Sequence, residues 1–195
     1  WVLHRPRTVE EGEEANAAPP VLEFDADGAF INAWGGPTAD FDWPGNEHGI
    51  HADHQGHIWV GGNGGDPESD DMLLKLTNTG ELLLQIGGRG VSGGNTDTDN
   101  LRRPAESFVY GQTNEVFVAD GYGNRRVIVL DADTGLVLAV IQTDITGFSL
   151  LWEKVTWAVP AAALGHMVRF EFRMDSDDIS NFPGWYIDDV LVTVP

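Results

Sequence analysis

The chain has 195 residues, with 31 acidic residues, 11 lysines and arginines and no cysteine, so its formal net charge is −20. Proteins that bind nucleic acid or an anionic membrane present a basic face, and this charge balance argues against both partners. The lack of cysteine excludes disulfides, cysteine zinc ligands and a thiol nucleophile. The 24 glycines and 10 prolines favour turn-rich β structure, and no apolar stretch approaches the length of a membrane-spanning helix.

Two units alternate along the first part of the chain. The first is a short apolar strand, a polar turn that closes on glycine, and a second strand. It recurs three times, with turn glycines Gly28, Gly80 and Gly135 spaced 52 and 55 residues apart. The second unit is a predicted β-hairpin at 49–60 and again at 106–120. Regularly spaced strands also build sandwiches, but four short strands per repeat favour the blades of a β-propeller.

Four histidines follow one another at a spacing of three: His48, His51, His54 and His57. Because this segment is a predicted hairpin, we expect the four side chains to scatter, with His54 and His57 exposed. We expect His48 on the loop that enters the inner strand of a blade. Imidazole is a common zinc ligand, so His48 is a candidate metal ligand, although a catalytic zinc commonly takes three protein ligands.

Three segments carry a resemblance to a known family. Trp-Val-Leu-His-Arg at 1–5, Glu-His-Gly-Ile at 47–50 and Asp-Gly-Tyr-Gly-Asn-x-Arg at 120–126 resemble peptidylglycine α-hydroxyamidoglycolate lyase and its bacterial NHL-repeat relatives. The resemblance covers residues 1 to about 140, in order and with similar spacing. It implies an all-β, NHL-type β-propeller, of which this chain would contain about three blades.

The resemblance also implies a site. The lyases are six-bladed propellers that split a peptidyl-α-hydroxyglycine into a peptide amide and glyoxylate, with zinc on three histidines and a structural calcium. It assigns a zinc ligand to His48, the catalytic tyrosine to Tyr122, a substrate-contacting arginine to Arg5, and a backbone carbonyl ligand of calcium to Ile50.

The remaining two zinc histidines have no counterpart in the sequence, which leaves several readings open. The first is a binding or scaffold protein without a complete catalytic site, taking a peptide or protein ligand. The second is a metal-dependent carbon–nitrogen lyase completed by oligomerisation or by further sequence. The third is a hybrid reading frame. Tyr122 also fits a purely structural turn, in which Gly121 and Gly123 would supply positive φ angles.

The last part of the chain has a different pattern. We assign residues 1–143 to propeller blades and 144–195 to a second, partial domain. The ending Gly-Trp-Tyr-Ile-Asp-Asp-Val at 184–190 resembles the C-terminal half of a jelly-roll β-sandwich of the kind appended to secreted bacterial peptidases. Five aspartates there are candidate calcium ligands, since calcium prefers carboxylate oxygens: Asp175, Asp177, Asp178, Asp188 and Asp189.

Two further expectations concern the whole chain. From the resemblance we expect a secreted or periplasmic protein whose signal peptide lies outside this sequence. Three blades would leave open sheets at both ends, which a closed propeller buries, so self-association is a further expectation.

Overall fold

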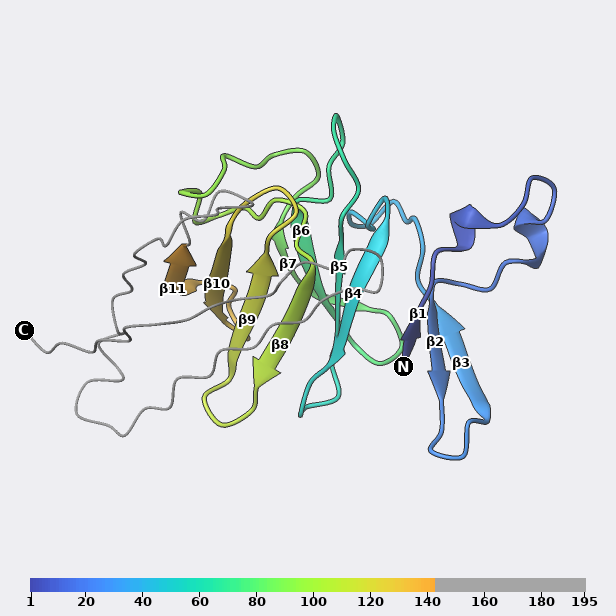
Figure 1. The fold of residues 1–195 in the computed structure, drawn as a ribbon. Coiled ribbons are helices and arrows are strands. Elements are labelled where there is room, and N and C mark those ends of the chain that lie inside the picture. The colour runs from blue at the N-terminus through green and yellow to red at the C-terminus, as the bar shows by residue number, and fades with distance from the viewer. Residues whose placement is uncertain (143–195) are drawn as a thin grey trace, which may run out of the picture. The chain divides into compact units, whose positions relative to one another are not determined.

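The structure is a computed structural model, and it describes residues 1–142. These residues form an all-β fold, which confirms the expected class, with helical structure limited to two short 3₁₀ turns (Figure 1). The 3₁₀ turns are η1 (Pro6–Thr8) and η2 (Glu14–Asn16). The strands are β1 (Val2–Leu3), β2 (Val21–Phe24), β3 (Phe30–Trp34), β4 (Glu47–Ala52), β5 (Ile58–Gly62), β6 (Met72–Leu76), β7 (Leu82–Gly87), β8 (Glu106–Tyr110), β9 (Glu115–Asp120), β10 (Arg126–Asp131) and β11 (Val137–Gln142).

The strands form three antiparallel sheets that follow one another in chain order (Figure 1). The first sheet has the order β1-β2-β3, the second β4-β5-β6-β7 and the third β8-β9-β10-β11. Each sheet is built from sequence neighbours, as expected for successive propeller blades. In the described residues, β1 occupies the position of β5 and β9, so the first sheet lacks a counterpart of β4 and β8.

The repeated turns explain why the three sheets share one pattern. Gly28, Gly80 and Gly135 have φ angles of 82°, 90° and 71°, a left-handed conformation that costs glycine little. At Gly80 a side chain would also lack space, since a Cβ would lie 2.7 Å from the Trp34 ring. The repeated glycine therefore supplies the left-handed turn conformation at all three positions. At Gly80 it also allows a close contact between the first and second sheets.

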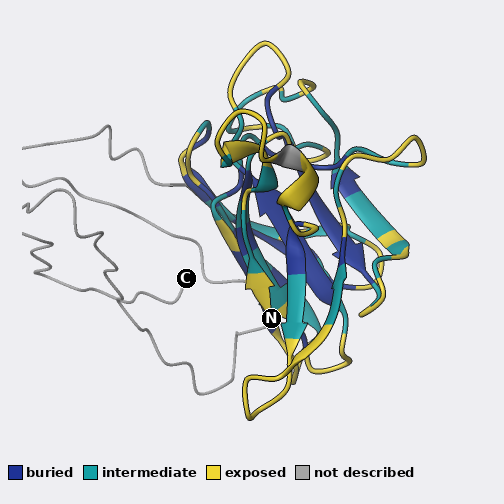
Figure 2. Cartoon of the chain, turned by 90° about the vertical axis from the view of Figure 1, so that its right-hand side faces the viewer, coloured by how far each residue is buried: buried dark blue, intermediate teal, exposed yellow. Residues whose placement is uncertain are grey.

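The second sheet is buried on both faces (Figure 2). On β5 and β6, alternate side chains point to opposite sides, and all ten residues of the two strands are buried. One cluster joins the second sheet to the first: Val21, Trp34, Trp43, Ile58, Val60, Met72, Leu74 and Leu76. The other joins it to the third: Trp59, Leu73, Ile86, Leu101, Val109, Val116, Val118, Ile128, Leu130 and Ala132.

A buried lysine also connects the second and third sheets. Lys75 is the next-to-last residue of β6 and is 5% exposed. Its Nζ donates to the Ala132 carbonyl at 2.8 Å, pairs with Asp133 at 3.3 Å and lies 5.5 Å from the centre of the Trp59 ring. Buried ammonium groups need such partners, so this contact fixes how the two sheets dock.

Two sequence-based expectations about local structure were wrong. His48 lies within β4 and not on the loop before it, because pairing of β4 with β5 already begins at Glu47. Gly121 and Gly123 are absent from the residues with positive φ. Gly123 is required by contact instead: a Cβ there would lie 2.2 Å from Cγ of Arg102. Among the described residues, no helix is long and apolar enough to cross a membrane.

Candidate functional site

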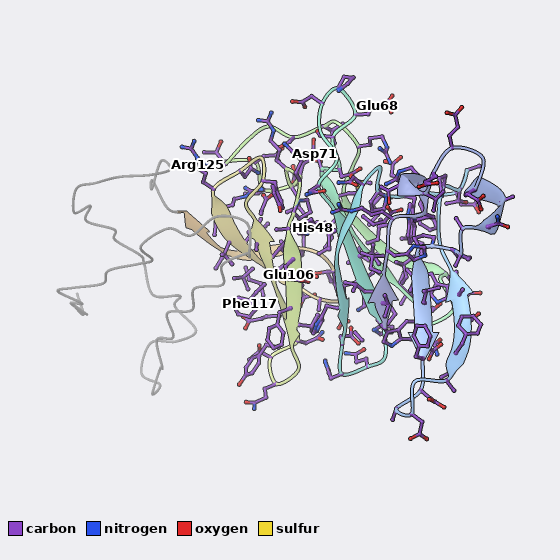
Figure 3. The ribbon with its side chains drawn as sticks, turned by 45° about the vertical axis from the view of Figure 1, so that its right-hand side comes forward. His48, Glu68, Asp71, Glu106, Phe117 and Arg125 are labelled. Atoms are coloured by element: carbon purple, nitrogen blue, oxygen red, sulfur yellow. The ribbon has the colours of Figure 1, made fainter. Side chains whose placement is uncertain are left out.

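The candidate site lies where β4 and β8 begin, next to the turn between β9 and β10. Gly49 allows this approach, because a Cβ at that position would lie 2.7 Å from the carbonyl oxygen of Ala105, immediately before β8. The Ala105 amide in turn donates to the Ala119 carbonyl of β9 at 2.8 Å. Three strands are thereby held together at one end, and Figure 3 labels His48 and Glu106 in this region.

His48 and Tyr122 form the centre of the site. Nδ1 of His48 lies 2.8 Å from the Ala105 carbonyl, and Nε2 lies 3.0 Å from the Tyr122 hydroxyl. Because a carbonyl only accepts, Nδ1 carries the proton and Nε2 of a neutral imidazole accepts from the hydroxyl. The two rings meet edge to face, 5.0 Å apart, and Tyr122 is 50% exposed. The pair therefore presents an oriented imidazole and a phenol to solvent.

Arg5 reaches the same place from the first sheet. Its Nε donates to the Glu47 carbonyl at 2.8 Å, one residue before His48. The Glu47 side chain, 2% exposed, accepts from the Trp43 indole at 2.8 Å and from Arg7 at 2.8 Å. This network fixes β1 and the following turn against β4. The structure thus brings together three residues that the resemblance assigns to a site: Arg5, His48 and Tyr122.

Arg103 joins them, although sequence reasoning did not identify it. Its guanidinium carbon lies 5.8 Å from the centre of the Tyr122 ring, and its Nε donates to the Asn63 carbonyl at 2.9 Å. Its backbone has a φ of 59°, which is uncommon for a residue other than glycine, and its amide donates to the Asp70 carbonyl. Nothing in the sequence signalled this conformation, because a following proline favours extended backbone with a negative φ at the residue before it.

The Asp-Gly-Tyr-Gly-Asn-x-Arg motif has a structural role as well. Asp120 and Arg126 form a fully buried ion pair at 2.8 Å, and Asn124 donates to the same carboxylate at 2.7 Å. Arg126 also donates to carbonyls of the preceding loop: Asn95, Asp97 and Asn100. These bonds hold the turn from which Tyr122 projects, so the motif both folds the turn and orients its tyrosine.

Most of the positive charges in the described residues have a carboxylate partner. Eight lysines and arginines occur within 1–142, and five of them pair with a carboxylate: Arg7, Lys75, Arg89, Arg102 and Arg126. Three have no carboxylate partner among residues 1–142: Arg5, Arg103 and Arg125. Arg5 donates to the Glu47 carbonyl and Arg103 lies over the Tyr122 ring, so two arginines without a carboxylate partner reach the candidate site. Glu106 also places a carboxylate there, near Gly49.

The other histidines of the segment lie apart from this pair. His51 packs against Phe108 with rings 5.3 Å apart, and its buried Nε2 has no partner within the described part of the chain. Burial lowers the pKa of His51, although the carboxylates of Glu106 and Asp53 oppose that shift. His54 is exposed, as expected, whereas His57 is half-buried, with its Nδ1 3.3 Å from Asp53.

Burial tends to raise the pKa of Asp53, but hydrogen bonds from the Trp59 indole and from the His57 and Gln55 amides outweigh it. The pKa of this carboxyl therefore lies below its ordinary value. Asp53 stays ionised and anchors the turn between β4 and β5, which leaves His48 as the histidine of this segment that meets a polar side chain at the site.

The donor set does not fit a complete zinc site. The bond from Nδ1 to a carbonyl is the arrangement that metal-binding histidines usually show. However, no group of three histidines or carboxylates that could hold a metal occurs in the described residues. His48 is a single imidazole, and Ile50 lies half-buried in β4 beside the first core cluster. The calcium candidates Asp175, Asp177, Asp178, Asp188 and Asp189 lie outside the described residues.

A cavity of about 270 Å³ lies beside the loop between β3 and β4. Its lining includes Phe41, Trp43, Arg7 and Arg89. Both arginines pair with buried carboxylates, Glu47 and Asp70, so their charge is compensated.

Comparison with known proteins places this geometry in context. No family model matches the chain. The sequence is similar to NHL repeat-containing protein 3 of Homo sapiens, with 28% identity over 127 residues, 63% of this chain and 34% of that protein. The protein of the same name in Mus musculus is 29% identical over 120 residues, 59% of this chain and 32% of its own length. The chain spans about a third of the length of these curated relatives. This similarity and the three successive sheets support an NHL-repeat family and a partial β-propeller.

Proposed function

We propose that this chain is part of an NHL-type propeller scaffold that binds a peptide or protein ligand. The surface would lie where β4 and β8 begin, around His48, Tyr122 and Arg5. The similarity to NHL repeat-containing proteins supports a scaffold. The single observation that carries the location is the 3.0 Å bond between His48 and the half-exposed Tyr122, because it fixes at the surface a phenol whose oxygen can still accept a hydrogen bond.

The experiment compares two tyrosines. Tyr122→Phe removes the hydroxyl that meets His48, and Tyr110→Phe removes a hydroxyl from another exposed tyrosine, on β8. Binding of each variant to an array of short synthetic peptides is compared with that of the unmodified chain. We expect Tyr122→Phe to lose about tenfold in affinity, typical of one well-placed hydrogen bond, with Tyr110→Phe unchanged. Equal binding by both variants, or no binding to any peptide, would contradict the proposal.

A second candidate is the zinc-dependent lyase to which the motifs point. The observation in its favour is the bond from Nδ1 of His48 to the Ala105 carbonyl. This bond directs Nε2, the nitrogen that could bind a metal, toward Tyr122. The missing ligands would have to come from outside residues 1–142 or from a second copy. Zinc content and glyoxylate release from an α-hydroxyglycine peptide test this candidate. A chain that neither retains stoichiometric zinc nor releases glyoxylate is not such a lyase.

An extracytoplasmic location is also a proposal, supported by the resemblance of the last residues to modules of secreted proteins. Fractionation of cells that express the full-length natural gene product would test it. Recovery of that product from the cytoplasm alone would contradict it.

A further inference from the structure

We propose that Arg103 is a ligand-binding residue of this surface and that, together with Arg5, it makes the surface select ligands that carry a carboxylate. The inference rests on the proposed function, because it assumes that the region around His48 and Tyr122 binds a ligand. The resemblance assigns no role to Arg103, which emerges from the contacts of the folded chain alone.

The position of the Arg103 guanidinium supports a role in binding. The group lies over the Tyr122 ring at 5.8 Å, and Tyr122 is the residue whose hydroxyl meets His48. A cation over an aromatic face is attracted to it, so the contact holds both side chains in place. The terminal nitrogens of Arg103 make no hydrogen bond within residues 1–142, since its side-chain bond runs from Nε to Asn63. They are the donors that remain for a ligand.

The backbone conformation of Arg103 also supports this role. A φ of 59° at an arginine costs free energy, and such conformations persist where the surrounding structure over-determines them. The Arg103 amide is fixed by Asp70, a residue whose buried carboxylate also accepts from the amides of Asn46 and Gly64. The strained residue is therefore anchored to the loop between β5 and β6, which these bonds hold in place. The Arg103 side chain is therefore preorganised in the absence of ligand, and this lowers the entropic cost of binding.

The net charge of the chain also bears on the kind of ligand. The chain is strongly acidic, so an anionic ligand is repelled at long range and needs a local positive site. Arg5, on the carbonyl next to His48, is exposed, and its terminal nitrogens also make no hydrogen bond among the described residues. A planar guanidinium suits a carboxylate because two parallel N–H groups can donate to its two oxygens. The chemistry that fits two such groups is a carboxylate, as at the end of a peptide.

The test uses two probes that differ only in that charge. N-acetylated tetra-alanine with a free carboxylate and the same peptide as an amide are titrated into the full chain. Binding is followed by NMR of the His48 imidazole. We expect the carboxylate peptide to bind about tenfold more tightly than the amide. Arg103→Gln should remove most of this preference.

Arg125→Gln is the matched control, because it removes the same charge from an arginine that also lacks a carboxylate partner. Arg125 lies immediately before β10, and its amide donates to Asn95 on the loop before β8 (Figure 3). This variant should keep the preference for the carboxylate. A loss of preference equal to that of Arg103→Gln would indicate a general charge effect and overturn the inference.

The outcomes separate the inference from the proposed function. If both peptides shift the His48 resonances with equal affinity, the surface binds ligands but Arg103 does not select them, and only the inference fails. If neither peptide shifts them, both the inference and the proposed function are contradicted. Circular dichroism and thermal unfolding of Arg103→Gln confirm that the variant folds. Arg103→Lys, which keeps the charge but loses the planar group, should retain part of the preference.

Discussion

At the scale of single residues, the buried carboxylates contribute most to the stability of the loops. Asp120 illustrates the effect, because its partner Arg126 has a side chain that is fully buried. Asp120→Asn leaves that guanidinium without a counter-charge, and we expect a loss of about 3–5 kcal/mol in the free energy of unfolding. Urea unfolding followed by tryptophan fluorescence measures it.

The control for this prediction is Asp66→Asn. Asp66 lies 3.8 Å from Arg102, and both side chains are well exposed. An exposed pair contributes about 0–1 kcal/mol, so this variant should unfold close to the unmodified chain. Similar losses in the two variants would show that the Asp120–Arg126 pair is not the anchor described above.

Asp97 gives a prediction about pH. Partial burial would raise its pKa, but hydrogen bonds from the Asn100 side chain and from the amides of Asp99, Gly93 and Asn100 lower the pKa to about 2. A folded pKa below the ordinary value of 3.8 stabilises the fold above about pH 4, and this contribution is lost as pH falls toward 2. Asp97→Asn should therefore weaken the fold at neutral pH and flatten the pH dependence of stability between pH 4 and 2.

Urea midpoints over that range test the Asp97 prediction. Asp99→Asn removes the same charge from the same loop, and its own carboxylate accepts none of these hydrogen bonds. It should keep the slope of the unmodified chain. An unchanged slope in Asp97→Asn would show that other carboxylates set the acid stability.

At the scale of elements, the turn between β9 and β10 shows how a glycine can be required by contact. A Cβ at Gly123 would lie 2.2 Å from Cγ of Arg102 and 2.9 Å from its carbonyl oxygen, whereas nothing lies within 4 Å of a Cβ at Gly121. Gly123→Ala should cost about 1–3 kcal/mol and displace Tyr122, because the backbone of Arg102 cannot move away cheaply. Gly121→Ala should be tolerated. Unfolding free energies and the NMR signals of Tyr122 distinguish the two variants.

The elements were largely predictable from the sequence, and the site was only partly so. The strands and turns could be predicted because the apolar pattern and the turn glycines repeat along the chain. Each repeat independently indicates the same strand–turn–strand structure. The contacts of Arg103 were missed because they join residues far apart in the chain, such as Asn63 and Tyr122. The positive φ angles expected at Gly121 and Gly123 were wrong for a related reason: the sequence shows that glycine is present but not which neighbour excludes a side chain.

At the scale of the whole molecule, both end sheets have apolar side chains on the face that points away from the second sheet. On the third sheet Phe108 is 53% exposed, although one side of its ring meets His51 of β4, and on the first sheet Val2 and Ile31 are 45% and 54% exposed. Exposed apolar faces favour association, so we expect the 195-residue chain to self-associate. Phe108→Glu should shift it toward the monomer in sedimentation velocity.

The control for self-association is Val91→Glu. Val91 is 55% exposed but lies on the loop between β7 and β8, away from both sheet faces. It should leave the association unchanged. A chain that is monomeric at all concentrations would contradict the prediction.

Glu47 links the stability of one sheet to events at the candidate site. Its side chain ties Arg7 and Trp43 to β4, while its carbonyl holds Arg5 beside His48. These contacts, together with the core cluster around Val21 and Trp34, attach the three-stranded first sheet to the second. Local opening of the first sheet breaks the bond between Arg5 and the Glu47 carbonyl, and it therefore also disturbs the candidate site. By thermodynamic linkage, a ligand that binds Arg5 in the closed state must slow the opening of β1–β3. The hydrogen-exchange rates of that sheet then become a measure of ligand occupancy at a site on its neighbour.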